Sequence, residues 1–200
     1  CAHDLASVQA LFKAAQVIEF VKKPSLTEML TKRVEFLTGY QNAAYAADYQ
    51  AFVEKVKAAE SKLGTTTRLS EAVVRYLFKL MAYKDEYEVA RLHTDKAFTD
   101  KIANMFEGDY KVVHHLAPPM IAKKNDKGEL VKQPFGPWMR SAFGVLAKMK
   151  GLRGTALDLF GKTEERRTER ALIVEYRACI DELLAGLTAA KLPLAIDIAR

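Results

Sequence analysis

The sequence predicts a mainly helical α+β domain, bundle-like, with a small antiparallel β element around residues 110–134. Apolar residues recur at three- and four-residue intervals along most of the 200-residue chain, the period of a helix with one buried face. The stretch Tyr110–Leu116, with the sequence YKVVHHL, instead favours a strand. Residues 120–124 and 129–133 then flank Asn125–Gly128, a suitable hairpin turn. Half of the residues are hydrophobic, enough for one sizeable core or for two small lobes that share an interface. No break in composition divides the chain, so we expect a single domain over residues 1–200.

The N-terminal part is expected to form amphipathic helices. The first covers Leu5–Val21 by its apolar period and ends at a Lys-Lys-Pro sequence. Ser25 and Glu28 have the spacing of a capping box and therefore begin the next helix. Its apolar stripe continues to Gly64, a suitable C-cap, with Gly39 as a candidate break into two helices.

Capping residues then place the helices on either side of the β element. Ser70 is the expected N-cap of a helix with a strongly apolar face, and Asp95 is that of a short helix ending near Phe106. Pro137 suits the first turn of the helix after the hairpin, which ends at Gly151.

Two more helices complete the expected bundle. Thr163, followed by two glutamates, begins a helix whose acidic first turn suits the helix dipole. Cys179 lies on the apolar stripe of that helix and is expected to be a buried thiol in a reducing compartment. Thr188 is the expected cap of a last helix that is still running at Arg200.

With Cys1 in place of an initiator Met, the chain is expected to be a C-terminal fragment of a larger multidomain enzyme. The alternative is a lipid anchor on Cys1.

Composition excludes several classes of protein. No apolar run approaches the roughly 18 to 20 residues of a membrane span, and the N-terminus does not have the pattern of a secretory signal, so we expect a soluble, cytoplasmic protein. Two cysteines are too few for an iron–sulfur cluster. Aromatic residues interleave poorly with the basic ones, so no nucleic-acid partner is expected.

Positive charge is concentrated in residues 111–153. This segment has nine Lys or Arg and two acidic residues and so a net charge of +7. The whole chain has +6, so the remaining residues together have −1. Such a field favours an anionic partner, although a solvated basic hairpin would have the same composition. The candidate anion- or partner-binding residues are Arg140, Lys148, Lys150 and Arg153.

The sequence predicts neither a metal site nor a phosphate loop. His114 and His115 are neighbours on a strand and point to opposite faces, and His93 has no partner at a ligand spacing. The segment Gly151–Gly154 follows a helix and lacks the Lys-Ser/Thr ending of a P-loop, so a C-cap followed by a turn is the simpler interpretation.

Two clusters of mixed charge remain as candidate polar contacts. Paired carboxylates next to a lysine could do acid–base chemistry if buried, but ion-pair networks on helices are more common. No Ser, Cys or Lys stands beside a His as an activated nucleophile would. The first cluster contains Lys84, Asp85, Glu86, Glu88 and Arg91, and the second contains Glu164, Glu165, Arg166, Arg167, Glu169 and Arg170.

Long strings of specific residues resemble the C-terminal region of the indolepyruvate ferredoxin oxidoreductases. They are SLTEMLTKRVEFLTGYQNAAYAADY (25–49), KDEYEVAR (84–91), VHHLAPP (113–119) and the stretch FGPWMRSAFGVLAKMKGLRGTALDLFGKTEERRTERALIVEY (135–176). The similarity extends from about His3 to Arg200. It implies a parent enzyme that oxidatively decarboxylates aryl 2-oxoacids with thiamine diphosphate, transfers the acyl group to coenzyme A, and passes electrons through iron–sulfur clusters to ferredoxin.

The resemblance assigns no catalytic residue or cofactor to this region, which lacks a GDG motif and clustered cysteines. The leading hypothesis is therefore a non-catalytic domain that packs against other domains or subunits of the parent through its two charged clusters. The alternative is an anion-binding module that docks ferredoxin or the phosphates of coenzyme A. An independent enzyme centred on Asp85 and Glu88 is the third hypothesis.

Overall fold

The computed structural model describes residues 23–117, 123, 125–129 and 131–200. It is 65% helical with one small two-stranded antiparallel sheet, which confirms the predicted fold class. The helix expected over Leu5–Val21 lies outside the described residues. Within the described ranges, no helix combines the length and the apolar character needed to cross a membrane.

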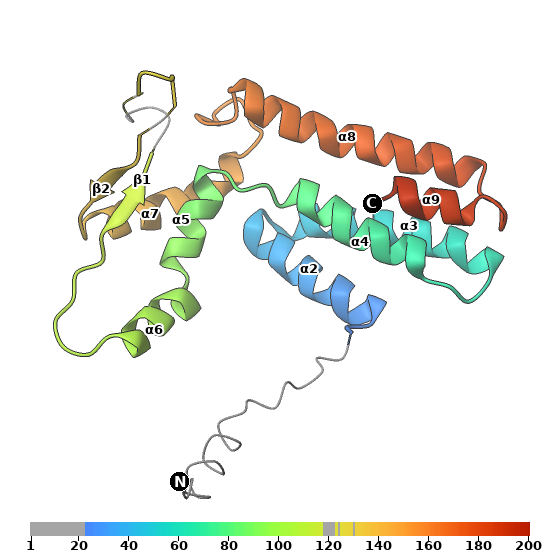
Figure 1. Ribbon diagram of the computed structural model, residues 1–200, viewed down its shortest axis with the longest axis horizontal. Helices are drawn as coiled ribbons and strands as arrows, with labels where there is room; N and C mark the ends of the chain where they lie inside the picture. The colour runs from blue at the N-terminus through green and yellow to red at the C-terminus, as the bar shows by residue number, and fades with distance from the viewer. Residues whose placement is uncertain (1–22, 118–122, 124, 130) are drawn as a thin grey trace, which may run out of the picture.

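Most helices form a bundle around α4, as Figure 1 shows. Helices α2 and α3 pack on one side of α4, and α8 and α9 cover another. The core of this bundle contains large side chains that are fully buried, including Leu37, Tyr40, Tyr49 and Leu77. The bundle contains α2 (Leu26–Tyr40), α3 (Ala43–Glu60), the 3-10 turn η1 (Ser61–Leu63), α4 (Arg68–Met81), α8 (Glu164–Ala185) and α9 (Leu192–Ile198).

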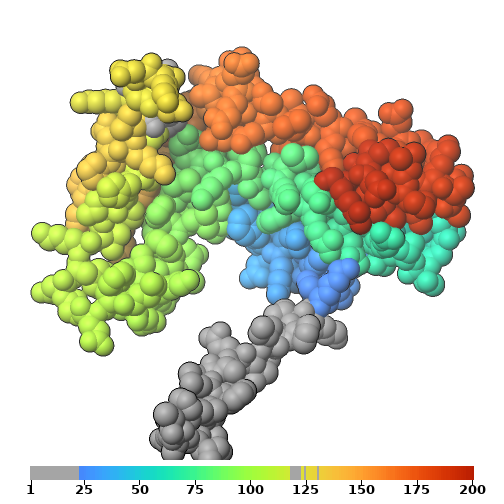
Figure 2. Space-filling view, viewed as in Figure 1, coloured from blue at the N-terminus to red at the C-terminus, as the bar shows by residue number. Residues whose placement is uncertain are grey.

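The remaining elements form a smaller part at one end of the molecule, here called the β lobe (Figures 1 and 2). Helices α5 and α7 pack together in it around a second hydrophobic cluster centred on Ala90, Met139 and Phe143. The β lobe contains α5 (Glu86–Thr94), α6 (Lys96–Met105), β1 (His114–Leu116), β2 (Gln133–Phe135), α7 (Met139–Lys148) and the 3-10 turn η2 (Met149–Leu152).

The predicted hairpin turn is present, but the strands differ from those expected. The strand expected over Tyr110–Leu116 is confined to His114–Leu116, the second strand begins only at Gln133, and most of residues 120–124 lie outside the described residues. Strands β1 and β2 are antiparallel, with His114 opposite Phe135. The turn falls at the expected residues: Gly128 N–H donates to the carbonyl of Asn125, and Gly128 has φ 80°, a conformation that favours glycine. His114 is buried and His115 exposed, so the two imidazoles do lie on opposite faces.

Several predicted helix starts are confirmed. Ser25 and Glu28 form the reciprocal capping box of α2, and Asp95 and Thr163 cap α6 and α8 through their side chains. The break between α2 and α3 comes just after Gly39, where Asn42 caps α3 with its side-chain oxygen.

The prediction that Ser70 caps α4 is wrong. The helix begins at Arg68, and Ser70 lies buried in its first turn. The cap instead comes from Glu60, the last residue of α3, whose carboxylate accepts from the N–H groups of Leu69 and Ser70 (both 2.9 Å) and from the Ser70 hydroxyl (2.6 Å). A tertiary contact thus replaces the local cap, because a buried carboxylate can serve three donors at once.

Three other expectations at helix positions are wrong. Pro137 lies in the turn before α7, which begins at Met139. The last helix begins at Leu192 and ends at Ile198, so Thr188 is in the preceding turn and the helix does not run to Arg200. Cys179 is exposed, because α8 buries a narrow stripe represented by Ile180 and leaves the neighbouring position open.

Candidate functional site

A buried arginine joins the bundle to the β lobe. Arg153 is 7% exposed, and its guanidinium makes a two-pronged ion pair with Asp85, with Nε–Oδ2 at 2.5 Å and Nη2–Oδ1 at 2.8 Å. Its remaining nitrogen, Nη1, donates to the backbone oxygen of Tyr40 and to Oε1 of Gln41, both at 2.7 Å. The guanidinium also lies 3.8 Å from the centre of the Tyr40 ring. All three nitrogens are therefore engaged within the protein.

Local structure brings these groups together from three segments. Asp85 is the N-cap of α5, where its side chain also accepts from Glu88 N–H. Arg153 directly follows η2, and Gly154, with φ 76°, turns the chain away after it. Burial lowers the pKa of Arg153, but the Asp85 carboxylate together with Tyr40 and Tyr83 raises it by more, so the guanidinium keeps its charge.

Asp158, which the sequence did not single out, organises the loop after Arg153. This buried carboxylate accepts from the N–H groups of Gly154 (2.7 Å) and Gly161 (2.9 Å) and from the Tyr87 hydroxyl (3.2 Å). Burial raises the pKa of Asp158, but the hydrogen bonds from these donors lower it by more. The net shift of this pKa is therefore downward. Burial and the nearby carboxylate raise the pKa of Tyr87 to about 12. The loop is therefore built around an ionised aspartate.

The acid–base hypothesis for Asp85 and Glu88 loses its basis. Both carboxylates are buried, but each is occupied by an arginine: Glu88 accepts from Arg91 at Nε and Nη2, both 2.7 Å away. Arg91 in turn lies over the ring of Phe36, 5.1 Å from its centre. These pairs hold α5 in place and leave neither carboxylate free to exchange protons with a substrate.

The second charged cluster is divided between internal bonds and solvent. Arg166 pairs with Glu169 at 2.5 Å and lies 3.7 Å from Glu86. Arg170 Nη2 donates to the backbone oxygen of Gly161 at 2.5 Å, while Arg167 is exposed. The cluster therefore anchors the start of α8 to α5 and to the loop before it. Lys84 is exposed, and its backbone oxygen lies 3.5 Å from Arg166 Nη2.

The four residues expected to bind an anion do not act as one group. Arg153 is buried as described above, and Lys150 donates to the backbone oxygen of Gly39, its pKa lowered by burial and by nearby arginines. Arg140 and Lys148 are exposed on α7. Of the four, these two are the fully exposed ones, Lys150 is partly buried and Arg153 is buried.

An apolar cleft of about 540 Å³ opens where α5, α7 and the start of α8 converge. Its walls include Met139, Phe143 and Phe160, and Trp138 lies at its edge with 62% of its surface exposed. A tryptophan of that exposure beside an apolar cleft is characteristic of a docking surface. The residues that line the cleft come from segments far apart in the chain, so no local sequence pattern indicates the cleft.

Glu86 is the chemically distinctive group of this cleft. One of its oxygens, Oε2, is buried and accepts no hydrogen bond from the described residues, although Arg166 Nε lies 3.7 Å from it. Burial raises the pKa of this carboxyl, with the Arg166 charge opposing. An acceptor in this state is suited to a hydrogen-bond donor from a docked partner.

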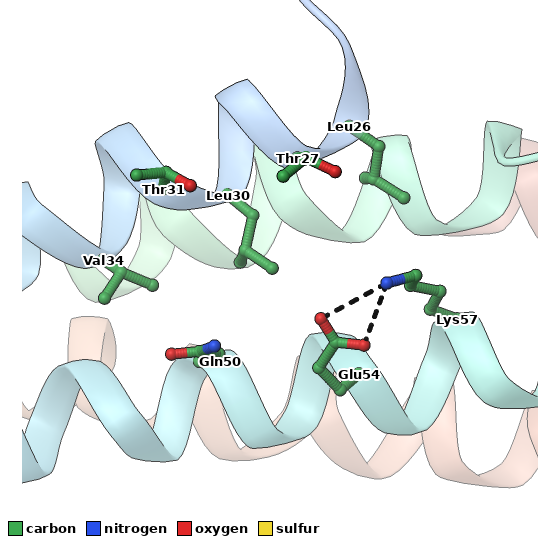
Figure 3. Close-up of a pocket in the computed structure, with 8 residues that line it drawn as sticks. All are labelled: Leu26, Thr27, Leu30, Thr31, Val34, Gln50, Glu54 and Lys57. Carbon is green, nitrogen blue, oxygen red and sulfur yellow. Dashed lines mark hydrogen bonds and ion pairs between the residues drawn. The ribbon is translucent and has the colours of Figure 1, made fainter.

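A second groove lies between α2 and α3, and Figure 3 shows its lining residues. Leu26, Leu30 and Val34 project from α2 toward α3 and pack against the bundle core. The charged residues facing them, Glu54 and Lys57, pair with each other at 3.2 Å. Because its charges satisfy each other, we assign no site to this groove.

Within the described part of the chain, no three His, Cys, Asp or Glu side chains gather as metal ligands.

Comparison with protein families matches residues 26–200 to a family described as a family of unknown function (DUF6537). No curated protein matches the chain. No solved structure matches it either.

Proposed function

The chain belongs to DUF6537, a family of unknown function, and we propose that it is a non-catalytic interface domain of an indolepyruvate ferredoxin oxidoreductase-like enzyme. The parent would use thiamine diphosphate to decarboxylate an aryl 2-oxoacid, form an acyl-coenzyme A and reduce ferredoxin through iron–sulfur clusters. The sequence strings at 25–49, 84–91, 113–119 and 135–176 support the choice of parent.

The apolar cleft carries the proposed interface role. It combines an open apolar floor, an exposed Trp138 and a buried Glu86 oxygen that accepts no hydrogen bond from the described residues and has only the more distant Arg166 charge at 3.7 Å. An apolar segment of the parent that also offers a hydrogen-bond donor, such as a lysine, an arginine or a free N–H group, would fill the floor and satisfy Glu86. We therefore assign another domain or subunit of the parent enzyme as the occupant.

The alternative role, docking of ferredoxin or coenzyme A phosphates, has less support. It needs a cluster of available cations, and Lys150 and Arg153 are engaged within the protein. Of the four candidate residues, Arg140 and Lys148 remain exposed on α7.

Trp138 is the only tryptophan of the chain and is a built-in probe of docking. We expect the chain labelled with fluorotryptophan to bind the rest of the parent enzyme, supplied as a separate polypeptide, with a change in its fluorine resonance. Ala142→Glu puts a charge into the cleft and should weaken this binding by about tenfold or more. Val145→Glu puts the same charge on an exposed position of the same helix that does not line the cleft, and should leave binding unchanged.

Equal effects of the two substitutions, or an unchanged resonance, would contradict docking through the cleft. The identity of the parent is tested separately, by assaying the native polypeptide recognised by an antibody to this chain. We expect it to be far larger than 22.4 kDa and to reduce ferredoxin with indolepyruvate and coenzyme A.

A further inference from the structure

A separate pocket of about 340 Å³ lies on the β lobe between α5, α6, α7 and the segment before β1. It shares no lining residue with the apolar cleft. Its fully charged side chains are Lys111 and Arg140, both exposed, and no carboxylate lines it among the described residues. Phe98 and Ile102 of α6 supply apolar wall. The pocket therefore combines positive charge with an apolar surface.

Two histidines lie together in this pocket. The rings of His93 and His114 are 5.0 Å apart and perpendicular, and Phe143 stacks on His93 at 5.2 Å. His114 is 9% exposed, and His93 Nδ1 is buried without a hydrogen-bond partner among the described residues. An aromatic environment explains where the rings lie but leaves a buried polar atom unsatisfied, which a bound ligand would correct.

We propose that this pocket binds a small organic anion, with its oxyanion held by Arg140 and Lys111 and its apolar body against Phe98 and the imidazoles. A guanidinium and an ammonium at the mouth suit a carboxylate or a phosphate equally in charge. The apolar wall and the small volume favour a compact ring over a bare ion. This binding site is independent of the proposed interface role.

The pocket also makes binding depend on pH. Burial lowers the pKa of both histidines, and for His93 the charges of His114 and then Lys84 lower it further, so both imidazoles are neutral near pH 7. The α6 side chains in the pocket do not titrate; α7 contributes Arg140, and the segment before β1 contributes Tyr110 and Lys111. A bound anion stabilises the protonated imidazoles, so affinity should rise as pH falls below the ordinary histidine range.

Titration of the full chain with benzoate, phenyl phosphate and inorganic phosphate, followed by histidine imidazole resonances, tests the proposal. We expect both ring compounds to shift His93 and His114, with tighter binding at about pH 5.5 than at about pH 7.5. Arg140→Gln should weaken binding by about tenfold or more. Lys148→Gln, which removes the same charge from an exposed position of the same helix outside the pocket, should not.

Each outcome separates the alternatives. Benzoate and phenyl phosphate distinguish a carboxylate from a phosphate as the preferred head group. Inorganic phosphate binding as tightly as the ring compounds would overturn the role of the apolar wall. Equal losses of affinity in Arg140→Gln and Lys148→Gln would mean that the anions bind by general charge attraction and would overturn the specific role of Arg140. The absence of a histidine resonance shift with any of the three compounds would overturn the site.

Discussion

Gly161 illustrates how one buried carboxylate constrains its neighbours. A Cβ at this position would lie 2.1 Å from Asp158 Oδ2 and 2.6 Å from Cγ, well inside contact distance. The Asp158 side chain can approach so closely because Gly161 has no side chain, and its N–H donates to the same carboxylate. Glycine is required here by close approach.

We therefore expect Gly161→Ala to lower the free energy of unfolding by about 1–3 kcal/mol, because Asp158 must give up hydrogen bonds to make room. Gly144→Ala is the matched control. Gly144 lies within α7, and apart from its chain neighbours and the nearby backbone of the helix no heavy atom lies within 4 Å of the added Cβ. Alanine should therefore raise the free energy of unfolding by about 0.5–1 kcal/mol. Urea unfolding measures both, and a Gly161→Ala variant as stable as the parent chain would show that the loop adjusts freely.

At the scale of elements, the α3–α4 corner depends on a contact that no local rule contains. Glu60 ends α3 and supplies the acceptor that α4 lacks at its own N-cap, Thr67, which makes no side-chain capping bond. The 3-10 turn and the loop between them return the chain so that the start of α4 meets the end of α3. One buried side chain thus fixes the angle at which two helices meet.

Glu60→Ala should lower the free energy of unfolding by about 2 kcal/mol or more, since three donors lose their acceptor in a buried place. Glu54→Ala, six residues earlier on α3, removes an exposed pair with Lys57 and should change stability by less than about 0.5 kcal/mol. Thermal or urea unfolding of the two variants gives the comparison. Similar losses in both would mean that the Glu60 contacts add little to what an exposed ion pair provides.

At the scale of the whole molecule, two hydrophobic clusters are joined through polar contacts. Arg153 links the N-cap of α5 to the end of α2, and Lys150 bonds to the same end of α2. Because a buried guanidinium without its partners is very costly, these contacts can only form when the bundle and the β lobe are both in place. Arg153 therefore couples the folding of the two parts.

Arg153→Met should lower the free energy of unfolding by about 3–5 kcal/mol, because it leaves Asp85 buried without its partner. Hydrogen exchange should show a larger loss of protection in the β lobe, around Ala90 and Phe143, than in the bundle core. Arg167→Met removes the same charge from an exposed site and should have little effect. Equal loss of protection throughout the chain would contradict the coupling role.

The sequence by itself determined those features that depend on neighbouring residues. The mainly helical class, the hairpin turn at Asn125–Gly128, and the caps at Ser25, Asp95 and Thr163 all follow from local periodicity, glycine conformation and side-chain-to-backbone bonds. These interactions connect residues two to four positions apart, so their pattern is already present in the printed chain.

Only the tertiary structure decided which charged side chains are paired inside the protein and which are free to bind a partner from solvent. Arg153 and Arg140 are both basic residues of the same segment, yet one is enclosed by Asp85 and Tyr40 and the other faces solvent. The apolar cleft beside Trp138 and the pairing of His93 with His114 likewise join residues far apart in the chain. The physical reason is burial: whether a charge is paired or free depends on what the fold packs against it, and spacing along the chain does not contain that information.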